Sequence, residues 1–329
     1  IEGYIVQSLG DSVFAEKENI KKVTLADSIE TMGSDVFEGC IGLTAFKAGR
    51  SLTMIGSNAF EDCTELTDVK LTGTVRTIGS GCTGLSEVTL PEGVTTIGSS
   101  AFSGCTGLSE VTLPEGVTTI GSSAFSGCTN LKQIALPDTL TTIYSYAFEG
   151  CTSLEAIELP DSITTMSAHA FYNCTKLSSV NYPKGWKATP DRYNNLEVYS
   201  DSVSYYSSPF EGCSALKSMT IPEGVTAIPK HAFRNLSALQ EVTLPASLTG
   251  IGAYAFYNAD GLVEMTLPAG ITAIGTCAFA DSSGLKRMDL SKATGLTQIN
   301  ESAFASCTGL SEVTLPGSLT TIYSYAFDT

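Results

Sequence analysis

The chain has 329 residues, a formal net charge of −16 and a pI near 4.5. Such an acidic chain lacks the positive surface that nucleic acids require, and anionic lipid surfaces repel it. It contains no run of about 18 uncharged apolar residues, which argues against direct insertion into a membrane. The first residues have neither the basic nor the apolar segment of a signal peptide, so we expect any signal and anchor to lie outside this sequence.

A repeated frame of 23 residues predicts the fold. Residues 85–107 and 108–130 are identical except at their last positions, Gly107 and Asn130. Residues 1–19 fit the same frame as a partial copy, so we expect a single solenoid over residues 1–329. The partial copy is followed by 13 repeats, which start at Ile20, Leu43, Leu66, Leu85, Leu108, Leu131, Leu154, Leu177, Leu216, Leu239, Leu262, Leu285 and Leu310.

The first half of each repeat predicts a short strand. In the copy at residues 85–107, Val88 and Leu90 lie two residues apart, which is the spacing of a strand with one buried face. Pro91 ends this strand because proline has no N–H to donate to a ladder.

The second half predicts a return path on the other side of the coil. Val94 and Ile97 lie three residues apart, so this segment is a turn or a very short extended piece rather than an alternating strand. Ala101 and Phe102 then predict a short buried turn. One coil buries too few side chains to offset its conformational entropy, and stability therefore requires neighbouring coils.

The repeat resembles that of the BspA-like leucine-rich repeat family, in the pattern Leu85-x-x-Val88-x-Leu90-Pro91-x-x-Val94-x-x-Ile97-Gly98-x-x-Ala101-Phe102-x-x-Cys105. The resemblance implies an α/β repeat solenoid, a right-handed curved stack with a parallel sheet on the concave face, short strands and turns elsewhere, and little helix. It also implies a secreted or surface-anchored bacterial protein. Some members of the family bind host matrix or plasma proteins, which implies a partner of this kind.

Nine of the ten cysteines share one position of the frame, where other copies hold Leu236, Ala259 and Ser282. This predicts a buried column of reduced thiols, with disulfides or metal binding as alternatives. No zinc-type spacing is present, so we expect no metal and no cofactor. Cys277 lies elsewhere in the frame and should be the most exposed thiol. The column contains Cys40, Cys63, Cys82, Cys105, Cys128, Cys151, Cys174, Cys213 and Cys307.

No catalytic constellation is evident, and we expect the protein not to be an enzyme. His169 and His231 share one frame position but lie too far apart to share a metal or a proton. They belong either to a polar and aromatic stripe along one edge or to an exposed variable position. A rival class, the polysaccharide lyases with a parallel β-helix, would need clustered carboxylates near a cation. The closest approach to such a cluster comprises Glu264, Arg287, Asp289 and Glu312.

Two features are candidates for binding a partner. Outward positions of the predicted strands are mildly basic in the N-terminal third and acidic and rich in threonine in the rest. This favours a basic protein partner or weak cation binding, or simply keeps the sheet soluble; the candidates here are Glu87, Glu110, Glu158, Glu241 and Glu264. The repeat at Leu177 has an insertion at about residues 184–206, rich in residue types that dominate recognition sites. Its aromatic side chains either bind a partner or form a small local core; the candidates are Trp186, Arg192, Tyr193, Tyr199, Tyr205 and Tyr206.

The leading interpretation is a non-enzymatic extracellular module of a bacterial cell-surface or secreted protein that mediates protein–protein adhesion. One alternative is binding of carbohydrate or mucin glycans through the aromatic insertion. The other is a purely structural stalk.

Overall fold

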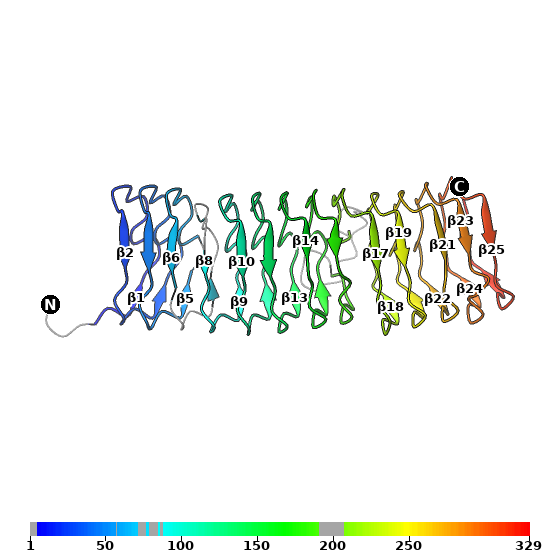
Figure 1. Cartoon of the computed structure of the whole chain (residues 1–329), viewed down its shortest axis with the longest axis horizontal. Coiled ribbons are helices and arrows are strands. Elements are labelled where there is room, and N and C mark those ends of the chain that lie inside the picture. The colour runs from blue at the N-terminus through cyan, green and yellow to red at the C-terminus, as the bar shows by residue number, and fades with distance from the viewer. Residues whose placement is uncertain (1–4, 57, 72–76, 79–84, 86–87, 191–206) are drawn as a thin grey trace. The chain divides into compact units, whose positions relative to one another are not determined.

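The computed structural model describes residues 5–56, 58–71, 77–78, 85, 88–190 and 207–329, with the backbone alone at residues 77–78. Its contacts divide the chain into two compact units, residues 1–160 and 161–329. Within each unit, short parallel strands from successive coils lie side by side, and the described residues contain no helix (Figure 1). The protein is therefore a parallel-strand β-solenoid, which confirms the predicted solenoid fold with little helix.

Each coil after the partial first copy has a first strand at the Val88 position, which ends before the Leu90 position to which the strand was predicted to extend. These strands form what we call the first-strand face. In residues 1–160 they are β2 (Lys22–Thr24), β4 (Ala45–Lys47), β6 (Asp68–Lys70), β8 (Val88–Thr89), β10 (Glu110–Thr112), β12 (Gln133–Ala135) and β14 (Ala156–Ile157). In residues 161–329 they are β16 (Ser179–Val180), β17 (Ser218–Thr220), β19 (Glu241–Thr243), β21 (Glu264–Thr266), β23 (Arg287–Asp289) and β25 (Glu312–Thr314).

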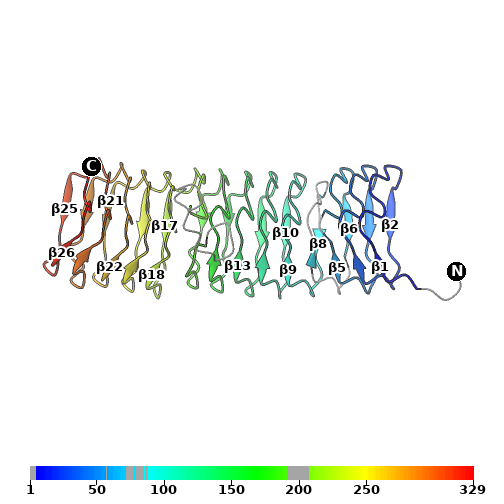
Figure 2. The ribbon, with the colours of Figure 1, turned by 180° about the vertical axis from the view of Figure 1, so that it is seen from behind.

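The segment ending at the Ile97 position is also a strand, and these strands form the second-strand face. Figure 2 shows both rows of strands with the ribbon turned to its other side. In residues 1–160 they are β1 (Ser8–Leu9), β3 (Thr31–Met32), β5 (Met54–Ile55), β7 (Thr77–Ile78), β9 (Thr96–Ile97), β11 (Thr119–Ile120) and β13 (Thr142–Ile143). In residues 161–329 they are β15 (Thr165–Met166), β18 (Ala227–Ile228), β20 (Gly250–Ile251), β22 (Ala273–Ile274), β24 (Gln298–Ile299) and β26 (Thr321–Ile322).

The repeat period sets the strand register. Glu110 of β10 lies opposite Gln133 of β12, and Thr119 of β11 lies opposite Thr142 of β13, one 23-residue period along the chain. On the first-strand face the middle residue of a strand points into the coil, as Val111 does between two exposed neighbours. Equivalent side chains of successive 23-residue coils therefore lie in columns.

A column of phenylalanine rings fills the turn side of each unit. Phe102 and Phe125 stack with ring centroids 5.2 Å apart, and Phe125 and Phe148 with centroids 5.3 Å apart. In the second unit Phe256 and Phe279 stack in the same way at 5.2 Å. Because each ring packs on the ring of the next coil, the column buries large apolar surfaces that a single coil would leave exposed.

The predicted cysteine column is buried. Every described column cysteine is a free thiol in the interior, whereas Cys277 is half-buried, as expected. Cys82 lies outside the described residues. The thiols also do more than fill space, since Cys128 Sγ donates a hydrogen bond to the carbonyl of Phe102 in the preceding coil at 3.0 Å. Ser282 Oγ makes the equivalent bond to the carbonyl of Phe256 at 2.8 Å.

The turn between the second strand and the cysteine column contains two residues with positive φ. The first is the position that holds the two histidines, at φ 63° and 61°; elsewhere it holds Ser12, Asp35, Asn58, Ser100, Ser123, Tyr146, Tyr254, Cys277, Ser302 and Tyr325. The second directly precedes the cysteine column and holds Glu16, Gly39, Asp62, Gly104, Gly127, Gly150, Asn173, Gly212, Asn235, Asn258, Asp281 and Ser306. Glycine, asparagine and aspartate suit this left-handed backbone.

The inserted segment is shorter than predicted at residues 184–206. Residues 184–190 follow the regular coil, since Ala188 bridges to Thr165 and the Trp186 ring occupies the interior position that Val94 has in its own coil. The extra segment therefore corresponds to residues 191–206, which lie outside the described residues.

Candidate functional site

The first-strand face of residues 161–329 is interrupted between β16 and β17. A hydrogen-bonded ladder joins β17 to β19, but among the described residues no ladder joins β16 to β17. A groove of about 440 Å³ lies along this break, lined in part by the small polar side chains of Ser179, Asn181, Ser218 and Thr220. Strand edges with no ladder between them and such hydroxyl and amide groups offer hydrogen bonds to an extended chain or a small polar ligand.

In the part of the chain that the structure describes, ladders are also absent between β19 and β21 and, in residues 1–160, between β12 and β14 and between β8 and β10. The break between β8 and β10 also has a groove. This groove has a volume of about 420 Å³, and Glu110, Thr89 and Thr112 contribute to its lining. The structure thus brings one predicted binding residue, Glu110, to the edge of a groove.

The other acidic candidates are exposed on the same type of face. Glu158 lies in the first unit, directly after β14, while Glu241 and Glu264 lie on β19 and β21 of the second. Glu87 is outside the described residues. Arg287, the cation of the possible carboxylate cluster, makes an exposed two-point ion pair with Glu312. Its Nε lies 3.1 Å from Oε2 and its Nη2 lies 3.2 Å from Oε1. This pairing fits a solvated strand face.

Trp186 is not an exposed recognition residue. Its ring is 2% exposed and packs 5.1 Å from the Tyr182 ring and 6.2 Å from the rings of Phe210 and Phe233. The prediction that Trp186 contacts a partner directly is therefore corrected in favour of the alternative, a small local core. This position belongs to the regular frame, where an apolar side chain faces inward. The other insertion candidates, Arg192, Tyr193, Tyr199, Tyr205 and Tyr206, lie outside the described residues.

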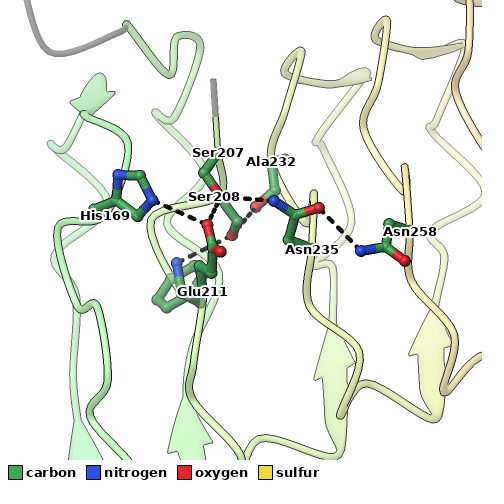
Figure 3. A network of polar contacts seen from close by, with 8 residues as sticks. His169, Ser207, Ser208, Glu211, Ala232, Asn235 and Asn258 are labelled. Atoms are coloured by element: carbon green, nitrogen blue, oxygen red, sulfur yellow. Dashed lines mark hydrogen bonds and ion pairs between the residues drawn. The ribbon is translucent and has the colours of Figure 1, made fainter. Parts of the chain in front are cut away.

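A polar network connects the turns of four successive coils in the second unit (Figure 3). His169 Nε2 lies 2.9 Å from Glu211 Oε2, and the same carboxylate accepts a hydrogen bond from Ser207. Asn235 Nδ2 donates to Ser207 Oγ at 3.5 Å, and Asn258 Nδ2 donates to Asn235 Oδ1 at 3.2 Å. Burial favours a higher pKa for Glu211, but the hydrogen bonds from His169 and Ser207 outweigh it, so the pKa is lowered.

A second cluster in the same turns contains His231, Arg234, Tyr254 and Tyr257. The His231 ring stacks on Tyr254 with centroids 5.2 Å apart, and burial lowers the pKa of His231 to about 3, helped by the charge of Arg234. The Arg234 guanidinium lies over Tyr257, 4.3 Å from the ring centroid, and 5.2 Å from that of Tyr254. Burial raises the pKa of Tyr257 to about 12.

These two clusters agree with the predicted polar and aromatic stripe in part. His169 and His231 do lie in such a stripe, but His231 is buried, which the alternative of an exposed variable position did not anticipate. The residues three positions further on, Tyr172, Glu211, Arg234 and Tyr257, were missed by sequence reasoning. The sequence does contain a signal for them, because two other copies of the repeat hold a serine at this position, Ser103 and Ser126.

The described residues contain neither a metal-binding cluster nor a membrane-spanning helix. No group of three or more histidine, cysteine or acidic side chains is placed to hold a metal ion there. No helix in that part of the chain is long and apolar enough to cross a bilayer.

Comparison with known proteins identifies the family. Residues 4–83, 80–193 and 204–329 match the profile of the BspA-type leucine-rich repeat region, in six copies. None of the curated proteins compared with the chain matches it.

The chain is similar to solved structures of bacterial repeat proteins. A leucine-rich repeat protein from Bacteroides ovatus is 27% identical, with 94% of this chain and 84% of that chain covered and a TM-score of 0.65. A leucine-rich cell surface protein from Faecalibacterium prausnitzii is 28% identical, with coverages of 96% and 84% and a TM-score of 0.48. A leucine-rich repeat protein from Eubacterium ventriosum is 24% identical, with coverages of 83% and 79% and a TM-score of 0.51. Since the family profile matches most of the sequence, the chain belongs to the BspA-type leucine-rich repeat family.

Proposed function

We propose that this chain is a non-enzymatic, extracellular protein-binding module of a bacterial cell-surface or secreted protein, and that it mediates adhesion through its first-strand face. The observation that carries the proposal is the groove between β16 and β17. There, two neighbouring strands present backbone edges without a ladder between them, beside exposed hydroxyl and amide side chains. An extended segment of a partner protein satisfies such edges with main-chain hydrogen bonds.

Charge complements this geometry. The chain carries a formal net charge of −16, and Glu241 is exposed one coil beyond Ser218 in the ladder. A partner segment flanked by lysine or arginine is therefore favoured over an acidic one. Host matrix or plasma proteins are the first candidates, in line with membership of this repeat family.

The test compares one substitution at two exposed serines. Ser218→Arg fills the groove, whereas Ser237→Arg places the same side chain on a turn of the second unit away from the groove. Binding of the wild type and both variants to immobilised matrix and plasma proteins is measured by surface plasmon resonance. We expect Ser218→Arg to weaken binding by about tenfold or more and Ser237→Arg to leave it nearly unchanged.

Other outcomes assign the function differently. Equal binding by the two variants would remove the groove from the binding surface. Binding confined to a glycan array and lost in Ser218→Arg would favour the glycan alternative, although buried Trp186 offers no exposed platform for a sugar. The absence of binding in both assays would favour a structural stalk.

A further inference from the structure

Arg234 is a buried arginine whose guanidinium has no hydrogen-bond acceptor among the described residues. The residue is 4% exposed, and its Nε–H is fully enclosed without a partner. Neither Nη atom is enclosed in this way, so the two terminal amino groups are where the guanidinium meets solvent. Buried polar groups in folded proteins almost always have partners, and an unpaired charged donor is costly. Arg234 is therefore poised for an acceptor that comes from outside the described coils.

Two tyrosine rings pack against the guanidinium. Its central carbon lies 4.3 Å from the ring centroid of Tyr257 and 5.2 Å from that of Tyr254, which itself stacks on His231. A cation–π contact attracts the charge and uses none of the guanidinium's N–H groups as a hydrogen bond to an acceptor. The arrangement therefore holds the guanidinium in place and leaves its terminal donors available.

The negative charge around the Arg234 guanidinium limits the charge of an anion that can bind there. Glu211 is close enough to influence the Arg234 charge, yet no ion pair joins the two among the described residues. The chain as a whole is strongly acidic, so polyanions are repelled while one isolated guanidinium can still bind one small anion.

We propose that Arg234 is the centre of a second binding site, which takes a single carboxylate group through its planar fork. The carboxylate belongs either to an aspartate or glutamate side chain of a partner or to an acidic sugar. The site shares no residue with the groove between β16 and β17, so each can fail without the other.

The test follows the Nε–Hε resonance of Arg234 by NMR in the full ¹⁵N-labelled chain. The resonance is identified by its absence in Arg234→Met, and sodium acetate is titrated as the minimal carboxylate at constant ionic strength against sodium chloride. We expect a saturable shift with acetate that chloride does not reproduce. The peptide acetyl-Gly-Glu-Gly-amide and sialyllactose are then compared, and the tighter of the two identifies the source of the carboxylate.

Two variants keep the test decisive. Arg234→Lys retains the charge without the fork but has no Nε–Hε resonance, so acetate binding by this variant and by the wild type is compared through the backbone amide shifts of Tyr254 and Tyr257. We expect the variant to bind acetate at least about tenfold more weakly. Arg50→Met, at an exposed arginine paired with Asp27, should bind acetate as the wild type does. The absence of a saturable shift with all three probes overturns the proposal. An unchanged affinity for acetate in Arg234→Lys, with thermal melting to check that the variant is folded, also overturns it. Loss of the shift in Arg50→Met does so too.

Discussion

At the scale of single residues, the cysteine column links neighbouring coils by hydrogen bonds as well as by burial. Cys63 Sγ donates to the carbonyl of Phe37 at 3.1 Å, and Cys151 Sγ donates to that of Phe125 at 3.2 Å. The occupancy of this position by Leu236 and Ala259 predicted burial but concealed the hydrogen bond. The acceptor belongs to the preceding coil, so the bond depends on how coils stack and not on local sequence.

The first prediction concerns this bond. Cys128→Ala removes the donor to the Phe102 carbonyl and should lower the free energy of unfolding by about 1 kcal/mol or more. Cys128→Ser keeps a donor in the geometry that Ser282 shows, and should cost less. Urea unfolding of both variants measures the difference, and a serine variant less stable than the alanine variant would contradict the account.

The second prediction concerns thiol reactivity. Burial raises the pKa of Cys63 to about 12 and that of Cys307 to about 11, which keeps both as unreactive thiols. Half-buried Cys277 should therefore be the first to react with Ellman's reagent in the native protein, and Cys277→Ser should abolish this early phase. After denaturation without reductant nearly all ten cysteines should react; fewer than about eight would show that disulfides form.

The third prediction is a pH dependence that arises from His231. Burial lowers its pKa in the folded state to about 3, while the unfolded chain takes up the proton below about pH 6.5. The unfolded state thus binds more protons between these values, so the free energy of unfolding falls as the pH falls, by up to about 1.4 kcal/mol per pH unit.

His231→Asn should flatten this dependence, since asparagine tolerates the positive φ of the position and does not titrate. Urea unfolding of wild type and variant at several pH values between 3 and 7 measures both slopes. Carboxylates such as Glu211 contribute to both proteins alike. Parallel curves would show that His231 is not held neutral by burial.

At the scale of the element, two left-handed residues let each short turn connect the second strand to the cysteine column. The strands and the turn at Ala101–Phe102 followed from apolar spacing, including the short extended piece that ends at Ile97. The left-handed positions could also have been predicted from the glycines and asparagines before the column, such as Gly127 and Asn173. The break between β16 and β17 could not, because strand spacing depends on how whole coils pack.

The fourth prediction separates conformational from steric demands on glycine. Gly127 has φ +72°, and a Cβ there would meet only ordinary contacts at 3.7 Å. Gly127→Ala should therefore cost about 1 kcal/mol through backbone strain, and Gly127→Asn should cost less.

Gly121 is the contrasting control, since a Cβ there would lie 2.6 Å from the backbone nitrogen of Ser99 in the preceding coil. Gly121→Ala should cost more than Gly127→Ala, and asparagine should not rescue it. Chemical denaturation of the four variants ranks them. A Gly127→Asn variant less stable than Gly127→Ala would refute the left-handed assignment.

At the scale of the whole molecule, three kinds of contact join one coil to the next. The strand ladders, the stacked rings of Phe102 and Phe125, and the bond from Cys128 all connect residues about one period apart. Stability is then carried by nearest-neighbour interfaces, as in other repeat proteins. The sequence predicted this organisation because the frame is nearly invariant. It could not place the groove and Arg234 sites, which occur where neighbouring coils differ.

The central claim is that a coil survives only in register with its neighbours, and a pair of deletions tests it most directly. Removal of residues 108–130 joins two coils in the same frame, whereas removal of residues 108–118 takes out fewer residues but breaks the frame. Circular dichroism and urea unfolding of both variants measure the outcome. The account predicts that the longer deletion folds with a cooperative transition close to that of wild type and that the shorter one is much less stable. A shorter deletion as stable as the longer one would contradict it.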